Sequence, residues 1–419
     1  MSRRAAPALL LATFAVLACS RDRTAAAQES YAREVKEAIP EIEEATGLKF
    51  KTPPKVERRT KAEVRSFLDR QFDEERSQQD LAGQQILLRR LGLIPDTMDL
   101  RRFLVDLYAE QVIGFYDPAT KVLYIVDGTP PEQVELVVQH ELVHALQDQY
   151  LNIDSLQHIR GDDDRVLAAQ SVIEGQAVLV PLQVMLGPGA EFPGGWDKVR
   201  EAIRENRSSM PKFASAPEIL QEMAIFPYLN GAEFVRRFDQ RFPHEQPFGA
   251  RMPTSSEQIL HPDRFFGAQP DQPILVTLPP PSGAGVRSTY DNDMGELGTR
   301  LFLFEHLKDQ AASVRGATGW AGDRYAILQT PKGDGVAWLT VWDSPAEATD
   351  FAQAAASVIS KRFGAVAPRE AYEGKVYSVR GRTLLLWIGV IAGHASVLYV
   401  DVPEGVNPAL IDPAKVKLR

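Results

Sequence analysis

The stretch His140-Glu141-Leu142-Val143-His144 lies inside an apolar run that extends from Val134 to Leu146. Residues four apart on a helix lie on one face, one above the other, so both imidazoles can reach a single ion. Glu141 follows His140 directly, which brings its carboxylate near a water on that ion but makes it an awkward third ligand. The pattern therefore predicts a zinc-type metal site with its own general base.

A helix start signal precedes this run. Thr129 is predicted as the N-cap, Pro130 as the first helical residue, and Glu132 completes a capping box. Apolar residues cover most of the circumference of the helix that follows, which predicts that the helix is buried. Two histidines and a glutamate in a buried helix are costly unless something pairs with them. The alternative to a metal is a pair of core histidines satisfied by hydrogen bonds.

The third metal ligand is expected from a second apolar segment, residues 166–180. The acidic run Asp162–Asp164 suits the start of a helix there, and Pro181 is predicted to end it. Glu174 is the only acid in the segment, and a buried carboxylate must be neutralised, paired or bound to a metal. Gly175 would let a neighbouring helix approach closely. Glu174 is thus the candidate ligand, and a salt bridge to an arginine is the alternative.

An HExxH helix followed by a helix that supplies a glutamate resembles the gluzincin metallopeptidases, the thermolysin-like group. The resemblance covers about residues 100–265, and the chain is also similar to uncharacterised bacterial metallopeptidases with a Gly-Phe-Tyr-Asp hairpin before such a helix. It implies a peptidase that binds one Zn²⁺ per chain through His140, His144 and Glu174. Glu141 would be its general base, and a peptide or protein its substrate.

One position departs from the gluzincin pattern. Thermolysin-like chains carry an aspartate four residues after the ligand glutamate, where it orients a ligand histidine, and this chain has Val178 there. Asp148 and the run Asp162–Asp164 are the expected substitutes. Such outer groups tune a metal site, so their identity matters for its affinity and activity.

The segment before the HExxH helix is predicted to be a β-hairpin. Residues 112–116 and 121–126 are β-rich and are joined by the turn Asp117–Thr120. By similarity to zincin folds, the strand Leu123–Val126 is expected to lie along the cleft and pair with extended substrate. The alternative is an ordinary hairpin within a sheet.

Two downstream residues are candidates for a second donor to the transition state. Tyr228 lies in the stretch 226–231, which is predicted to open a helix. His261 lies at the end of a short predicted helix that Ser255 or Ser256 caps and Pro262 stops. A tyrosine or histidine facing the zinc is usual in gluzincin sites, so either residue would stabilise the oxyanion.

The N-terminus predicts export. Two arginines precede a short apolar run over residues 5–18, which is too short for a membrane span and is typical of a signal peptide. The sequence Val16–Cys19 resembles a bacterial lipobox, with cleavage before Cys19 and a lipid on that residue. Ala25–Ala27 offers an ordinary signal-peptidase site instead. We expect a cell-envelope lipoprotein or a periplasmic or secreted protein, attached to a membrane only through Cys19.

Charge and cysteine content narrow the function further. The formal net charge of -9 disfavours nucleic acid as a partner. Cys19 is the only cysteine, so a large apolar core must hold the mature chain together without disulfides. The alternative function is a non-catalytic exported binding or scaffold protein that keeps a zincin fold. The intact Glu141 argues against that alternative.

The predicted fold class is α+β, with a zincin-like catalytic domain followed by a smaller α+β domain with an antiparallel sheet. The predicted division is a signal peptide over 1–27, a mostly helical region over 28–100, the catalytic domain over 101–278 and the C-terminal domain over 286–419. Further predicted elements are helices over 34–46, 61–91, 297–308 and 346–363, and strands over 56–59, 325–329, 336–342, 375–379, 383–391 and 395–400.

Overall fold

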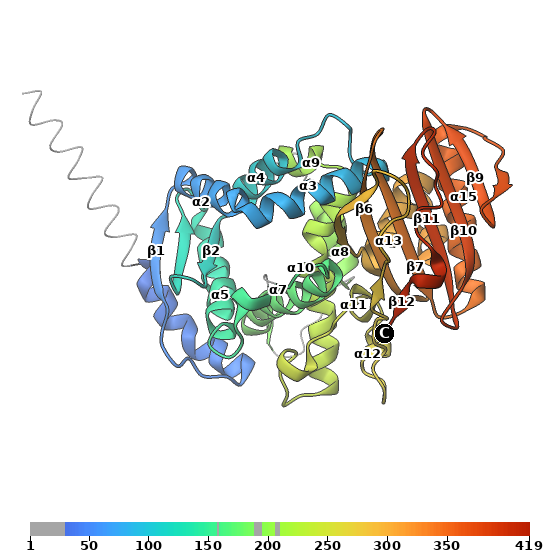
Figure 1. Ribbon diagram of the computed structural model, residues 1–419. Helices are drawn as coiled ribbons and strands as arrows, with labels where there is room; N and C mark the ends of the chain where they lie inside the picture. The colour runs from blue at the N-terminus through green and yellow to red at the C-terminus, as the bar shows by residue number, and fades with distance from the viewer. Residues whose placement is uncertain (1–29, 157–158, 188–194, 206–209) are drawn as a thin grey trace, which may run out of the picture. The chain divides into compact units, whose positions relative to one another are not determined.

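The computed structural model describes residues 30–156, 159–187, 195–205 and 210–419 (Figure 1). The predicted signal peptide, with Cys19 and both cleavage sites, lies outside the described residues. Among the helices that are described, none combines the length and the apolar character that a membrane crossing requires.

The chain is a mixed α+β protein whose strands pair mainly in antiparallel fashion, as the sequence predicts. It forms two compact units that are interleaved along the sequence. The described residues of the first unit fall within Met1–Ser66, Gln111–Asp154 and Gln176–Glu191. Those of the second fall within Phe67–Glu110, Ser155–Gly175 and Phe192–Arg419. Four helices contain residues of both units: α2 (Lys61–Asp73), α4 (Leu100–Gln111), α6 (Ile153–Leu156) and α7 (Asp163–Leu186).

The first unit is built around a three-stranded sheet in the order β1-β3-β2. Strand β1 (Lys55–Arg59) is parallel to β3 (Val122–Val126), and β2 (Gly114–Asp117) is antiparallel to it. The predicted hairpin is therefore present, but β3 has partners on both sides. The expectation that Leu123–Val126 pairs with substrate is wrong, because the backbone groups of a central strand are already used. Within the described sheet, β2 and β1 are the edges.

The apolar face of helix α5 (Pro131–Gln147) lies against this sheet and carries the HExxH stretch (Figure 1). Its buried valines and leucines form one core with β3 and the helix over residues 30–46. The predicted capping box is wrong, because Pro130 is the N-cap and makes no side-chain cap. The Thr129 hydroxyl instead donates to the carbonyls of Ile113 and Val126, which ties the turn after β3 to the start of β2.

Helix α7 (Asp163–Leu186) carries Glu174. Its start is as predicted, since Asp162 accepts the N–H of Arg165 and two more acids occupy the first turn. The prediction that Pro181 ends the helix is wrong. A proline removes one backbone hydrogen bond, and α7 continues for five residues beyond it.

The second unit contains a seven-stranded antiparallel sheet in the order β5-β6-β7-β11-β10-β9-β8. Helices α13 and α15 lie on one face (Figure 1), where Phe302 and Phe351 pack edge-on against Trp338. The chain around Val276 and Ile411 covers the other face. The predicted order of two strands, a helix and three strands is present, with short strands added at both edges. The predicted helix over 61–91 is two helices, α2 and α3, separated at Glu74.

The remaining elements of the chain complete the second unit and the link between α5 and α7. The bounds not yet given are α3 (Glu75–Arg90), α8 (Gly195–Glu205), α9 (Pro211–Ser215), α10 (Glu218–Arg241), η2 (Gly249–Arg251), α11 (Ser256–Leu260), α12 (Pro262–Phe265), β4 (Val276–Thr277), β5 (Arg287–Asn292), α13 (Gly295–Leu307), α14 (Gln310–Ala317), β6 (Trp320–Thr330), β7 (Gly333–Trp342), α15 (Pro345–Phe363), β8 (Arg369–Ala371), β9 (Gly374–Val379), β10 (Arg382–Ile391), β11 (His394–Pro403), η3 (Pro413–Lys415) and β12 (Lys417–Leu418).

Candidate metal centre

The two histidines of the HExxH stretch point their Nε2 atoms at the same place. His140 Nε2 and His144 Nε2 lie 3.1 Å apart. Their rings meet edge-on, with centroids 4.7 Å apart and an interplanar angle of 87°. Helical spacing produces this arrangement because one turn of α5 separates the residues. Two ligands of one tetrahedral Zn²⁺, each ~2.0–2.1 Å from the ion, would lie about 3.3 Å apart.

Glu174 joins the two histidines. One ligand atom from each of His140, His144 and Glu174 lies within 4.8 Å of the other two. Glu174 lies near the middle of α7. Two residues beyond it, Gln176 accepts a hydrogen bond from Gln147 of α5 at 3.0 Å. The predicted donor set is thus brought together.

Gly175 has the role that its position next to Glu174 predicts. A Cβ on Gly175 would come within 2.2 Å of the backbone of Gly231 in α10. A Cβ on Gly231 would come within 1.9 Å of the carbonyl oxygen of Ser171 in α7. Only glycine allows two helix backbones to approach this closely, so these residues set where α7 meets α10 in the second unit.

The predicted base, Glu141, is 7% exposed. Its Oε2 accepts the backbone N–H of Tyr116 at 2.8 Å. Tyr116 belongs to β2, and its N–H points away from β3 toward α5. The edge strand therefore orients the base.

The outer partner of His144 is Gln147, which the sequence analysis missed. Gln147 Oε1 lies 3.0 Å from His144 Nδ1. Asp148 does not have this role, because its Oδ2 accepts from the Tyr116 hydroxyl at 2.8 Å and from Lys121 Nζ at 2.6 Å. The run Asp162–Asp164 is engaged at the start of α7 instead. The spacing of three residues on one helix was the available signal.

Tyr228 and His261 lie in different surroundings. Tyr228 is 40% exposed and sits in the middle of α10, which begins at Glu218 rather than at the predicted stretch 226–231. It precedes Gly231 by three residues and so shares the face of α10 that meets α7. His261 ends α11, which Ser255 caps as predicted, and its Nε2 contacts buried Glu296 at 2.8 Å. Neither residue belongs to the group of three metal-ligating side chains.

A second group of acids among the described residues has a different explanation. Glu257, Asp271 and Asp343 surround Arg264 Nη1 at 2.7, 3.2 and 2.9 Å. Burial, followed by the charge of Glu296, raises the pKa of Glu257 to about 9. The guanidinium already occupies the position that a cation would take. We therefore interpret this group as an ion-pair network.

Comparison with known proteins reaches only the C-terminal part of the chain. Residues 285–392 match the family model described as Domain of unknown function (DUF8575). This match covers strands β5 to β10 and the helices on them, and leaves the metal-ligand group outside. No curated protein matches the chain. No solved structure matches it either.

Proposed function

We propose that this protein is an exported zinc-dependent peptidase that hydrolyses peptide bonds with water. The observation that carries the proposal is the convergence of His140, His144 and Glu174, whose ligand atoms lie within 4.8 Å of one another. Glu141, buried and adjacent in sequence to His140, supplies the base that such a group needs. A scaffold protein that catalyses no reaction would not need Glu141 as a base.

The donor chemistry supports Zn²⁺. Two imidazole nitrogens and one carboxylate oxygen form the three-ligand set of catalytic zinc sites, which leave a further position open. When bound, Zn²⁺ would polarise the scissile carbonyl and lower the pKa of a water at the open position. The hydrogen bond from His144 Nδ1 to Gln147 leaves Nε2 as the lone-pair atom that faces the group.

Glu141 would move the proton of the attacking water. The bond from Tyr116 N–H holds Oε2, so the carboxylate has a defined orientation on α5. In the proposed reaction the carboxylate takes a proton as water attacks the carbonyl and passes it to the leaving nitrogen.

Strand β2 is the proposed place for an extended substrate. It is an edge of the described sheet and contacts α5, whereas β3 is fully paired. Main-chain hydrogen bonds to an edge strand bind peptides with little dependence on side chains. A substrate held along Gly114–Asp117 would pass next to Tyr116, whose N–H orients Glu141.

The decisive experiment is Glu141→Gln, because glutamine still accepts the Tyr116 N–H but cannot take a proton. We expect zinc to stay bound at one per chain while hydrolysis of a broad peptide library, read by mass spectrometry, falls at least ~10²-fold. Glu135→Gln, at an exposed position of the same helix, is the matched control and should keep full activity. Stoichiometric zinc without any cleavage by the wild-type protein would refute the peptidase and favour the binding protein.

Glu174→Ala tests the ligand set independently of activity. Removal of the carboxylate should lower zinc occupancy sharply, measured by metal analysis after dialysis against a weak chelator. Glu135→Ala should leave the metal content unchanged. Full zinc content in the Glu174→Ala variant would exclude Glu174 from the set.

A further inference from the structure

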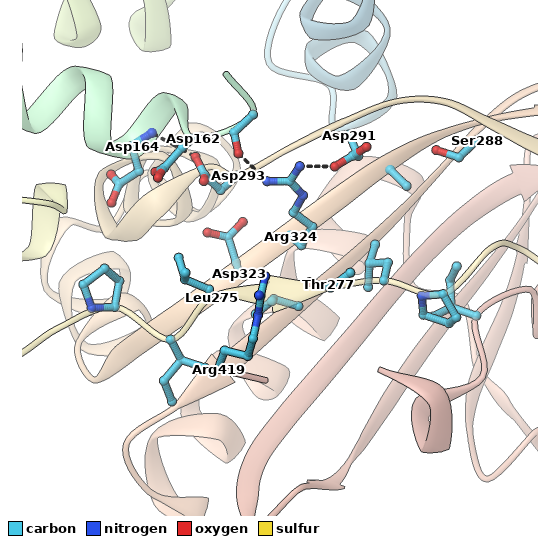
Figure 2. A pocket seen from close by; sticks show the side chains of 18 of the residues that line it. Asp162, Asp164, Leu275, Thr277, Ser288, Asp291, Asp293, Asp323, Arg324 and Arg419 are labelled. Atoms are coloured by element: carbon cyan, nitrogen blue, oxygen red, sulfur yellow. Dashed lines mark hydrogen bonds and ion pairs between the residues drawn. The ribbon is translucent and has the colours of Figure 1, made fainter. Parts of the chain in front are cut away.

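Asp323 is a buried aspartate that stabilises the second unit. It lines a cavity of about 630 Å³ (Figure 2) and is 5% exposed. Its carboxylate accepts the indole N–H groups of Trp320 and Trp338 and two backbone N–H groups. These donors belong to the same unit, so we assign Asp323 to the packing of that unit. Asp148 of the first unit is different, because its contacts lead to the proposed base.

Asp148 lies at the end of the helix that carries the proposed base. It is the C-cap residue of α5 and follows Glu141 by seven residues. Seven residues are about two turns of a helix, so both carboxylates lie on one face of α5, about 10 Å apart along its axis. The side chain of Asp148 is 2% exposed. A carboxylate buried in this way is costly unless donors satisfy it.

Tyr116 of β2 contacts both carboxylates of α5. Its backbone N–H donates to Glu141 Oε2 at 2.8 Å, and its hydroxyl donates to Asp148 Oδ2 at 2.8 Å. Burial, followed by the hydrogen bond to Asp148, raises the pKa of the Tyr116 phenol, so the hydroxyl keeps the proton that it donates. One residue of the edge strand is therefore attached to α5 at two points.

Strand β2 needs such an attachment because the sheet restrains it on one side only. The strand is four residues long and pairs only with β3 in the described sheet. A short strand with one neighbour opens more readily than a central strand does. The N–H of Tyr116 points away from β3, so pairing with β3 does not by itself hold it on Glu141. The bond between Tyr116 and Asp148 supplies a second point of attachment.

Lys121 contacts Asp148 from the other end of the turn that follows β2. Its Nζ lies 2.6 Å from Asp148 Oδ2 and balances the buried charge. Lys121 has a φ of 58°, a left-handed conformation that few residues other than glycine adopt. Its N–H donates to the carbonyl oxygen of Asp117 at 2.8 Å, which closes the turn. Asp148 thus binds one residue before the turn and one after it.

We propose that Asp148 is a positioning residue of the peptidase and that it acts on Glu141 through Tyr116. This inference rests on the proposed function, in which Glu141 is the base. Asp148 holds the side chain of Tyr116, and the backbone of Tyr116 then fixes the direction of the Glu141 carboxylate. The carboxylate of Asp148 accepts from Tyr116 and Lys121 rather than from a metal ligand, so we expect zinc affinity not to depend on it.

Three variants of the full chain isolate the bond between Asp148 and Tyr116. Asp148→Ala removes the acceptor, whereas Asp148→Asn keeps an oxygen that can accept from the hydroxyl. Tyr116→Phe removes the hydroxyl but keeps the N–H that binds Glu141. Tyr150→Phe is the matched control, because that hydroxyl donates to the carbonyl oxygen of Lys49 at 2.7 Å in the same unit. Thermal unfolding verifies that each variant is folded.

The kinetic test separates kcat from KM. We expect kcat to fall about tenfold or more in Asp148→Ala and in Tyr116→Phe, with KM within about twofold of wild type. Zinc should stay bound at one per chain. Asp148→Asn should recover most of kcat, and Tyr150→Phe should keep all of it. The double variant Asp148→Ala with Tyr116→Phe should be no slower than the slower single variant, because both remove one interaction.

Full kcat in Asp148→Ala would overturn the proposal. It would also fail if the two losses multiply in the double variant, because Asp148 would then act by another route. Failure of Asp148→Asn to recover kcat would show that the hydrogen bond is not the reason for the loss.

Amide hydrogen exchange measures the same contact without a substrate. In NMR spectra of protein with isotope-labelled tyrosine, the Tyr116 signal is the one that disappears in Tyr116→Phe. We expect its exchange to become about tenfold or more faster in Asp148→Ala and to stay unchanged in Asp148→Asn and Tyr150→Phe. Unchanged exchange in an active Asp148→Ala protein would overturn the positioning role alone. A wild-type protein that cleaves no peptide would instead refute the peptidase itself, whatever the exchange rates show.

Discussion

Gln147 and His144 are joined by a hydrogen bond of 3.0 Å between Oε1 of the amide and Nδ1 of the ring. Gln147 Nε2 in turn donates to Gln176 Oε1 at 3.0 Å, which sets the orientation of the amide. An amide oxygen only accepts, so the ring proton is on Nδ1 and the lone pair of His144 is on Nε2. The neutral tautomer that a metal requires is thus selected before any metal binds.

The first prediction follows from that bond. Gln147→Leu removes the acceptor at similar size and should weaken Zn²⁺ binding about 10–100-fold, because outer partners orient ligand histidines. Competition with a chromogenic chelator measures the affinity. Gln133→Leu, at an exposed position in the first turn of α5, should leave it unchanged. Equal zinc affinity in the Gln147→Leu and wild-type proteins would show that Gln147 does not orient His144.

The surroundings of Tyr228 and His261 lead to opposite predictions for which of them is the second donor to the transition state. Tyr228 lies on the face of α10 that meets α7. The ring of His261, in contrast, is already hydrogen-bonded to Glu296. We therefore expect Tyr228→Phe to lower kcat about 10²–10³-fold with little change in KM. His261→Gln should lower thermal stability and leave kcat within about threefold of wild type. A large kcat loss in the His261 variant alone would reverse this assignment.

The contact between α7 and α10 predicts an unusual response to alanine. Gly→Ala within a helix normally stabilises by up to ~1 kcal/mol. At Gly231 the new Cβ would meet the Ser171 carbonyl oxygen at 1.9 Å, so Gly231→Ala should destabilise by about 2 kcal/mol or more. Denaturant unfolding measures the change, and Gln240→Ala, exposed on the same helix, should shift it by less than ~0.5 kcal/mol. Unchanged stability of the Gly231→Ala variant would mean that the helices have room to separate.

The burial of His306 predicts that the free energy of unfolding of the protein depends on pH. Burial lowers its pKa from 6.5 to about 4, and its Nε2 donates to the carbonyl oxygen of Leu91 at 2.8 Å. The unfolded chain binds this proton more readily than the folded chain does. The free energy of unfolding should therefore be full above pH 6.5 and fall as the pH drops toward 4. Urea unfolding at a series of pH values should show a shallower fall in His306→Gln, and parallel curves would contradict the assignment.

Some features of the site followed from local sequence. The HExxH spacing predicted that two imidazoles and a carboxylate share one helix, because helical periodicity is a property of neighbouring residues. The single acid in an apolar segment predicted Glu174, and Ser255 was a predicted cap that the structure contains. Predictions from the sequence were wrong where one residue type suits two different structural positions. Thr129 reads as an N-cap, but its hydroxyl donates to two carbonyls across the turn.

By itself the sequence determined the HExxH helix, the acid that converges on it, the α+β class and the alternation of the C-terminal strands. Each of these depends on short-range periodicity or on the cost of burying charge. Only the tertiary structure decided that Gln176 orients the Gln147 amide and that β2 rather than β3 is an edge. These depend on which segments distant in the chain pack together, and packing is settled by the whole core rather than by any one stretch of it.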